Sequence, residues 1–158
     1  MLARITIENH ADQEARLSVL PTLWFRNTWR VSGEEPPALF LDGDGVAVEH
    51  PRLAGYRLDA AATPEGVLPQ AVFCDNETNT ARLFGSAPIT GYPKDGINDH
   101  VIAGLDTVNP DRRGTKAAWW YRVSVPVAGP SCGCGCTART RTPPPRRNPG
   151  TAGSSTTS

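Results

Sequence analysis

Apolar and polar residues alternate in several short runs of the chain. Residues 3–8 read ARITIE and residues 14–19 read EARLSV, each with every second position apolar. A period of two is typical of a strand with one buried face. Turn-forming residues occupy positions 9–13 between the runs, so we predict that the two strands form a hairpin.

Further strands are predicted downstream by the same criterion. Asp42-Gly43-Asp44-Gly45 separates two apolar runs and indicates a tight hairpin, because glycine adopts positive φ without strain. The same residues could begin a calcium loop. Such a loop needs an acidic residue at its twelfth position, which is Leu53 here, so the hairpin is favoured. The predicted strands after the first two lie at residues 38–41, 46–48, 56–59, 70–74 and 119–125.

The decapeptide LPTLWFRNTW at residues 20–29 has a different pattern. Leu23 and Phe25 are expected on one side, and Trp24 and Arg26 on the other. Trp24, Arg26 and Trp29 could form a platform for a sugar ring. The alternative is that the tryptophans belong to the core; we favour it for Trp24 and weigh the two equally for Trp29.

A long polar stretch, residues 76–118, interrupts the strands. Connections in compact domains are usually about 4–6 residues, and longer ones are usually functional or disordered. This one contains apolar residues such as Leu83, Phe84 and Ile97, which predict an ordered loop region. Its only expected helix is residues 95–102, with Asp95 as the N-cap. About seven short strands with almost no helix predict an all-β fold, an antiparallel β-sandwich.

The long loop region also contains most of the polar and charged residues that could act in catalysis or binding. Two nearby carboxylates are what glycoside hydrolysis requires, but acidic and amide side chains in loops more often cap turns. Capping is the favoured interpretation for each residue singly. The residues concerned are Asn76, Glu77, Asn79, Lys94, Asp95, Asn98, Asp99 and His100.

Other classes of catalytic or metal site find no support in the sequence. There is no GxSxG elbow for a serine nucleophile and no phosphate-binding loop. His10, His50 and His100 are not at metal-ligand spacing. We therefore predict no catalytic residue, no metal and no cofactor in this chain.

Composition divides the chain near residue 128. Residues 1–128 carry 12 Lys/Arg and 16 Asp/Glu, a formal charge of −4, whereas residues 129–158 carry four arginines and no acid, +4. Residues 129–158 also have no Leu, Ile, Val, Met, Phe, Tyr or Trp, so we predict a disordered tail after one β domain. A nucleic-acid arm is less favoured, because no aromatic or lysine lies among the arginines.

The motif Cys132-Gly133-Cys134-Gly135-Cys136 has two competing explanations besides an authentic linker. Three cysteines could bind zinc or copper(I). Alternatively, reading their codons from each last base yields an apolar/polar alternation typical of a strand. We favour the hypothesis that residues 129–158 are an out-of-frame translation, which sequencing the gene would test.

The first residues have no apolar core of a signal peptide. No run approaches the ~18 apolar residues of a membrane span, and Cys74 is the only cysteine before residue 129. We predict a cytoplasmic protein without a membrane or nucleic-acid partner.

Four stretches resemble the N-terminal β-sandwich of bacterial glucosidase-like proteins in glycoside hydrolase family 63. They are LPTLWFRNTW (20–29), NETNTARLFG (76–85), YPKDGINDHVI (92–102) and VNPDRRGTKAAWWYRVSVP (108–126). The resemblance implies a part of a super-β-sandwich, from a family that hydrolyses α-glucosidic bonds in oligosaccharides or glycosylglycerates. In that family the catalytic groups lie on an (α/α)6 barrel, which this chain lacks.

The resemblance therefore implies a non-catalytic domain fragment, with carbohydrate bound through the missing catalytic domain. Lys94, Asp95, Asn98 and Asp99 are the expected rim of that substrate site, with Trp29 and Arg26 as further substrate-binding candidates. The alternative is a stand-alone carbohydrate-binding module that uses Trp24, Trp29 and the loops of residues 76–118.

Overall fold

The computed structural model describes residues 2–53, 55–127 and 134–140. The described chain is mostly antiparallel β-structure, as the sequence predicts. The strands are β1 (Leu2–Ile7), β2 (Ala15–Val19), β3 (Thr22–Trp24), β4 (Ala38–Asp42), β5 (Gly45–Glu49), β6 (Arg57–Ala60), β7 (Gln70–Cys74), β8 (Arg113–Gly114), β9 (Lys116–Val125) and β10 (Cys134–Thr140). The helices are α1 (Trp29–Ser32), α2 (Thr80–Phe84) and α3 (Gly96–Ala103).

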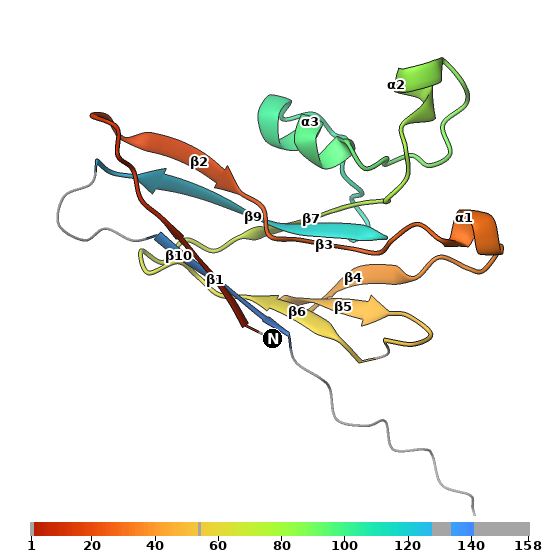
Figure 1. Cartoon of the computed structure of the whole chain (residues 1–158), viewed down its shortest axis with the longest axis horizontal. Helices are drawn as coiled ribbons and strands as arrows, with labels where there is room; N and C mark the ends of the chain where they lie inside the picture. Colours follow the sequence, from red (N-terminus) through yellow and green to blue (C-terminus); the bar gives the residue numbers. More distant parts are fainter. Residues whose placement is uncertain (1, 54, 128–133, 141–158) are drawn as a thin grey trace, which may run out of the picture.

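Two sheets pack as layers (Figure 1). The first has the strand order β1-β10-β6-β5-β4-β8. The second is built on β9, which pairs with β2 and then β3 along one edge and with β7 along the other. β4 and β5 form the predicted hairpin, with Asp42 opposite Gly45.

The core lies between the two sheets and is centred on β9. Trp119, Tyr121, Val123 and Val125 are buried at alternate positions. They pack with buried residues of β4, β5 and β7, namely Leu39, Val46 and Phe73, and with Ala117. This confirms the alternation predicted for residues 119–125.

The outer face of the second sheet carries a smaller apolar cluster beneath α3. Val72, Cys74 and Ala118 of the sheet pack against Ile97 of the helix. Figure 1 shows α2 and α3 on this side and α1 at one end of the layers. The long loop region therefore covers one sheet face, as an ordered structure.

The prediction that residues 3–19 form a hairpin is wrong. β1 pairs with β10 and β2 pairs with β9, so the two strands lie in different sheets. The polar residues 9–13 carry the chain from one layer to the other. Asn9 stabilises this passage, because its buried side chain donates to the carbonyls of Gln13 and Val125.

Strand β10 lies within residues 129–158, for which the sequence predicts disorder. Residues 134–140 instead lie between β1 and β6, with Cys136 opposite Ile5 and Ala138 opposite both Ala3 and Ala60. Backbone pairing in a sheet needs no large apolar residue, which is why composition did not reveal it. The remaining residues of the predicted tail, 129–133 and 141–158, lie outside the described residues.

Two details of the long loop region differ from expectation. Besides α3, it contains a second helix, α2, capped by Asn79, whose side chain accepts from the Arg82 amide. Leu83 and Phe84, expected as anchors, are 62% and 74% exposed. The residues of the loop that do pack on the sheet are Tyr92, Ile97, Val101 and Val108.

Within the described residues, no helix is long and apolar enough to cross a membrane.

Candidate functional site

A pocket of about 440 Å³ opens beside α1, where the long loop region meets the end of the sandwich. Its wall combines carboxylates, an arginine and an indole with hydroxyl groups. The lining residues are Trp29, Arg30, Gly33, Glu34, Pro36, Asp75, Glu77, Ile89, Thr90 and Thr115. The pocket thus brings together residues from distant parts of the sequence.

Glu77 is the buried acid of this pocket, with a side chain only 9% exposed. Its Oε1 accepts from the Trp29 indole Nε1 at 3.0 Å and from Arg30 Nε at 2.9 Å. Burial of a carboxylate is costly unless it is paired and hydrogen-bonded. The indole and the guanidinium meet this requirement and fix the carboxylate in one orientation.

Asp75 follows β7 directly and lies in the same wall. Its Oδ2 accepts from the Thr90 hydroxyl at 2.5 Å, and its Oδ1 accepts from the Thr115 amide at 3.2 Å. The Thr115 hydroxyl in turn accepts from the Asn76 amide at 2.7 Å. These bonds hold the segment after β7 against the segment that precedes β9.

The pocket has the chemistry to bind a hydroxylated ligand. Carboxylate oxygens accept hydrogen bonds from hydroxyls, and an arginine that is half exposed has donors to offer. The acids Glu34, Asp75 and Glu77 outnumber the single cation, Arg30, which favours a neutral ligand over an anion. Trp29 is only 8% exposed, so it supports Glu77 and leaves no open ring face for stacking.

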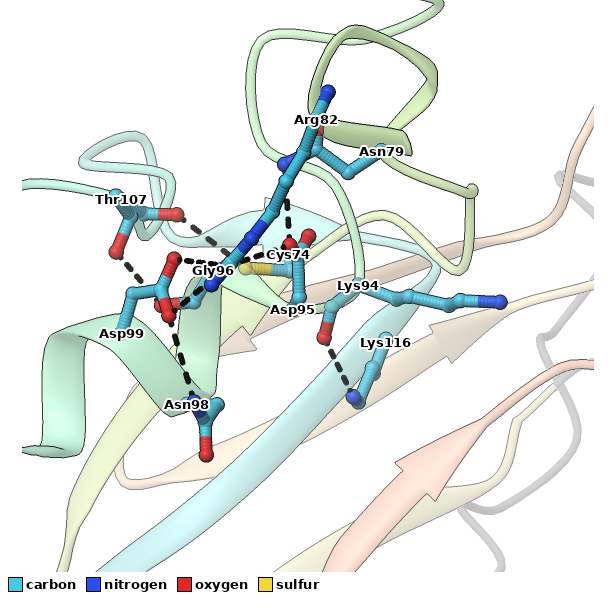
Figure 2. A network of polar contacts seen from close by, with 10 residues as sticks. All are labelled: Cys74, Asn79, Arg82, Lys94, Asp95, Gly96, Asn98, Asp99, Thr107 and Lys116. Carbon is cyan, nitrogen blue, oxygen red and sulfur yellow. Dashed lines mark hydrogen bonds and ion pairs between the residues drawn. The ribbon is translucent and has the colours of Figure 1, made fainter. Parts of the chain in front are cut away.

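Asp95 and Asp99, predicted as part of a substrate rim, are engaged elsewhere (Figure 2). Both form salt bridges with Arg82, at 3.1 Å and 3.0 Å. Asp95 also accepts from the Asn79 amide at 3.0 Å. Asp95 occupies the N-cap position of α3, but its side chain forms no cap hydrogen bond. The two acids therefore join α2 to α3.

Lys94 and Asn98 line a second groove, of about 320 Å³, beside α3. Lys116 of β9 lines the same groove, and its ammonium donates to the Lys94 carbonyl at 2.8 Å. The four residues predicted as one rim are therefore divided between an internal ion-pair network and this groove.

The three residues considered for a sugar platform, Trp24, Arg26 and Trp29, do not line one pocket. Trp24 is 54% exposed at the end of β3, against the core position favoured from the sequence, and Arg26 is also exposed. Neither lines the pocket that Trp29 lines. Leu23 and Phe25 pack against the core on the opposite side, as predicted.

Sequence reasoning missed Asp75, Arg30 and Lys116 as pocket or groove residues. Asp75 directly follows a buried strand, a position that places a polar side chain at a sheet end, and this signal was available. Arg30 and Lys116 gave no such signal, because their neighbours come from α1 and α3 through tertiary packing. Within the described residues, no group of three or more metal-ligating side chains occurs.

Cys74, at the end of β7, lies under α3 and is fully buried. Burial raises the pKa of its thiol to about 12. Its sulfur contacts the Thr107 carbonyl at 3.5 Å. A thiol held protonated in this way is a packing residue and not a nucleophile.

Comparison with known proteins gives one informative match. No family model matches the chain, and no solved structure matches it. An uncharacterized protein of Saccharomyces cerevisiae, YMR196W, is 28% identical over an alignment of 143 positions, and the match covers 75% of this chain. The match covers 13% of the yeast protein, so the chain is similar to a small part of a much longer relative.

Proposed function

We propose that this chain is a non-catalytic β-sandwich domain of a glucosidase-like glycoside hydrolase. The reaction of the whole protein is then hydrolysis of α-glucosidic bonds in oligosaccharides or glycosylglycerates. The observation that carries the proposal is the combination of the four glucosidase-like stretches with a match to 13% of a much longer relative. A sandwich that forms a small part of a large protein suits a supporting role.

The hydrogen bonding of the pocket carboxylates supports a non-catalytic role. A general acid or base must exchange a proton with the substrate. Glu77 Oε1 already accepts from two donors, and both oxygens of Asp75 accept from the fold itself. Both acids therefore act first as structural acceptors that shape the pocket.

The test is the release of glucose from α-glucosides by the purified chain. The proposal predicts none above the buffer rate, and turnover would overturn it.

The alternative is a stand-alone carbohydrate-binding module. It is favoured by the open Trp29–Glu77 pocket and by the exposed Trp24. Calorimetric titration of neutral glucosides and glycerate-linked sugars separates the two proposals. Saturable binding that Asp75→Asn weakens supports the module, whereas the absence of binding supports the domain that needs its catalytic partner.

A further inference from the structure

The use of lysine in this chain is unusual and localised. Fourteen of the 16 basic residues are arginines, and the two lysines are Lys94 and Lys116. Both line the groove beside α3, although 22 residues separate them. Lysine offers a compact ammonium with rotatable donors, whereas arginine offers a planar fork. Because both lysines line this one groove, the groove is a candidate binding site.

Besides the two lysines, the groove is lined by four apolar residues and by the polar residues Thr22 and Asn98. Its apolar lining consists of Ile97, Val101 and Ile102 of α3 and of Leu20, which precedes β3. Asn98 adds an amide, of which one hydrogen is directed at Asp99 at 3.4 Å. Aliphatic side chains combined with polar groups that can orient a ligand are the usual lining of small-molecule sites.

Lys116 presents its ammonium at this groove from a partly buried position. It lies on β9 between Trp24 of β3 and Cys74 of β7. The ammonium has three donors, and within the described part of the chain its one hydrogen bond goes to the Lys94 carbonyl. No described carboxylate lies within salt-bridge distance of it. Burial lowers its pKa, and the Asp95 carboxylate, which is not in contact with it, offsets this only in part.

The surrounding charges leave a single positive charge to be balanced. Arg82 binds both Asp95 and Asp99. With Lys94 and Lys116, this network holds three cations and two carboxylates, a formal +1. The Lys94 side chain points away from the Lys116 ammonium (Figure 2) and donates to the Thr78 hydroxyl at 3.3 Å. A monoanion therefore matches the site better than a phosphate dianion.

We propose that this groove binds a small aliphatic monocarboxylate, with its carboxylate on the Lys116 ammonium and the Asn98 amide. Its apolar body lies along Ile97 and Val101. Lys94 contributes to the positive field without direct contact. This site is separate from the Trp29–Glu77 pocket, so the inference does not depend on the carbohydrate proposal.

Selective isotope labelling gives a direct test, because the full chain contains only two lysines. With lysine labelled at Cε, NMR resolves one signal for each residue, and Lys94→Met assigns them. Titration with hexanoate is expected to move the Lys116 signal saturably and to raise the pKa of Lys116, while the Lys94 signal moves less. Hexanol and hexylammonium, equal in apolar length, are the matched controls and are expected to have no such effect.

Substitution of each lysine then measures how much that lysine contributes to hexanoate binding. Loss of a charge-assisted hydrogen bond in Lys116→Met should weaken hexanoate binding about 10-fold, and Lys94→Met about 2-fold, as for an exposed charge. The proposal is overturned if hexanoate leaves the Lys116 signal unmoved, or if hexanol moves it equally. The wild-type titration decides this even if Lys116→Met fails to fold.

Discussion

Trp29 and Glu77 are 48 residues apart, yet the indole Nε1 donates to the buried Glu77 carboxylate at 3.0 Å. This bond connects the first residue of α1 to the start of the long loop region. The backbone extends the connection, because the Glu77 carbonyl accepts from the Lys94 amide at 3.0 Å. Glu77 therefore connects the pocket to the long loop region, through its side chain on one side and its backbone carbonyl on the other.

Glu77→Ala should reduce the free energy of unfolding by about 2 kcal/mol. The substitution leaves the buried Trp29 indole without an acceptor, and an unsatisfied buried donor costs roughly 1–3 kcal/mol. Arg30 is 52% exposed, so water replaces most of its lost pairing. Urea denaturation followed by tryptophan fluorescence measures the change.

Two companion variants make the test specific. Glu77→Gln retains an acceptor and should cost about half as much. Arg26→Ala removes an exposed side chain and should stay within about 0.5 kcal/mol of the wild type. Equal losses in all three variants would contradict the account of Glu77.

Gly96→Ala should destabilise the protein, although alanine is normally the better helix residue by about 1 kcal/mol. Gly96 is buried at the start of α3, and a Cβ there would collide with the Thr107 carbonyl and press on Cys74. Thermal unfolding should show a lower Tm. Asn98→Ala, two residues along on the exposed side of α3, is the control and should leave Tm nearly unchanged.

The Cys74 thiol should resist modification in the folded protein. In the background Cys132→Ser, Cys134→Ser, Cys136→Ser, the remaining thiol is expected to react with a disulfide reagent only after denaturation. Its raised pKa, about 12, keeps it protonated, and the thiolate is the reactive form. Rapid reaction at pH 8 without denaturant would contradict its position under α3.

The same pKa shift predicts a pH dependence of stability. The thiol ionises above pH ~9 in the unfolded chain but only near pH 12 in the folded one, so the unfolded state releases a proton first. Stability should therefore fall as pH rises above 9, by up to ~1.4 kcal/mol per pH unit. Cys74→Ala should show a shallower fall between pH 9 and 10.5, and an unchanged slope would refute the assignment.

Arg82→Met should loosen α2 without unfolding the sandwich. Arg82 links the two helices through Asp95 and Asp99, and α2 has no buried residue of its own. Hydrogen exchange should become faster in residues 80–84 and remain unchanged in β9. High salt should give the wild type part of the same effect, because ions screen exposed pairs. Equal exchange in wild type and variant would show that α2 is held otherwise.

The sequence predicted the parts of the fold that local patterns determine. The alternation in β9 and the glycines after Asp42 specify a strand and a hairpin regardless of what surrounds them. Pairing between distant strands has no local signature. β2 follows β1 by a short turn, yet it pairs with β9 about a hundred residues later.

The candidate site was predicted in outline only. Lys94, Asp95, Asn98 and Asp99 lie close together in the sequence, which predicts a single rim. Helical geometry separates them, because residues four apart share a face. Asp95 and Asp99 therefore meet Arg82, while Lys94 and Asn98 line the groove. Trp29 lines the pocket without Trp24 and Arg26, because the chain turns into α1 after Thr28 and the strand alternation ends there.

The central claim is that this chain supplies a non-catalytic domain, and the most direct measurement is hydrolysis of an α-glucoside by the purified protein. Wild type, Asp75→Asn and Glu77→Gln should be compared at equal concentration, with glucose release as the readout. The account predicts that all three equal the buffer rate. Saturable turnover by the wild type that either variant abolishes would contradict it, since those carboxylates would then be catalytic.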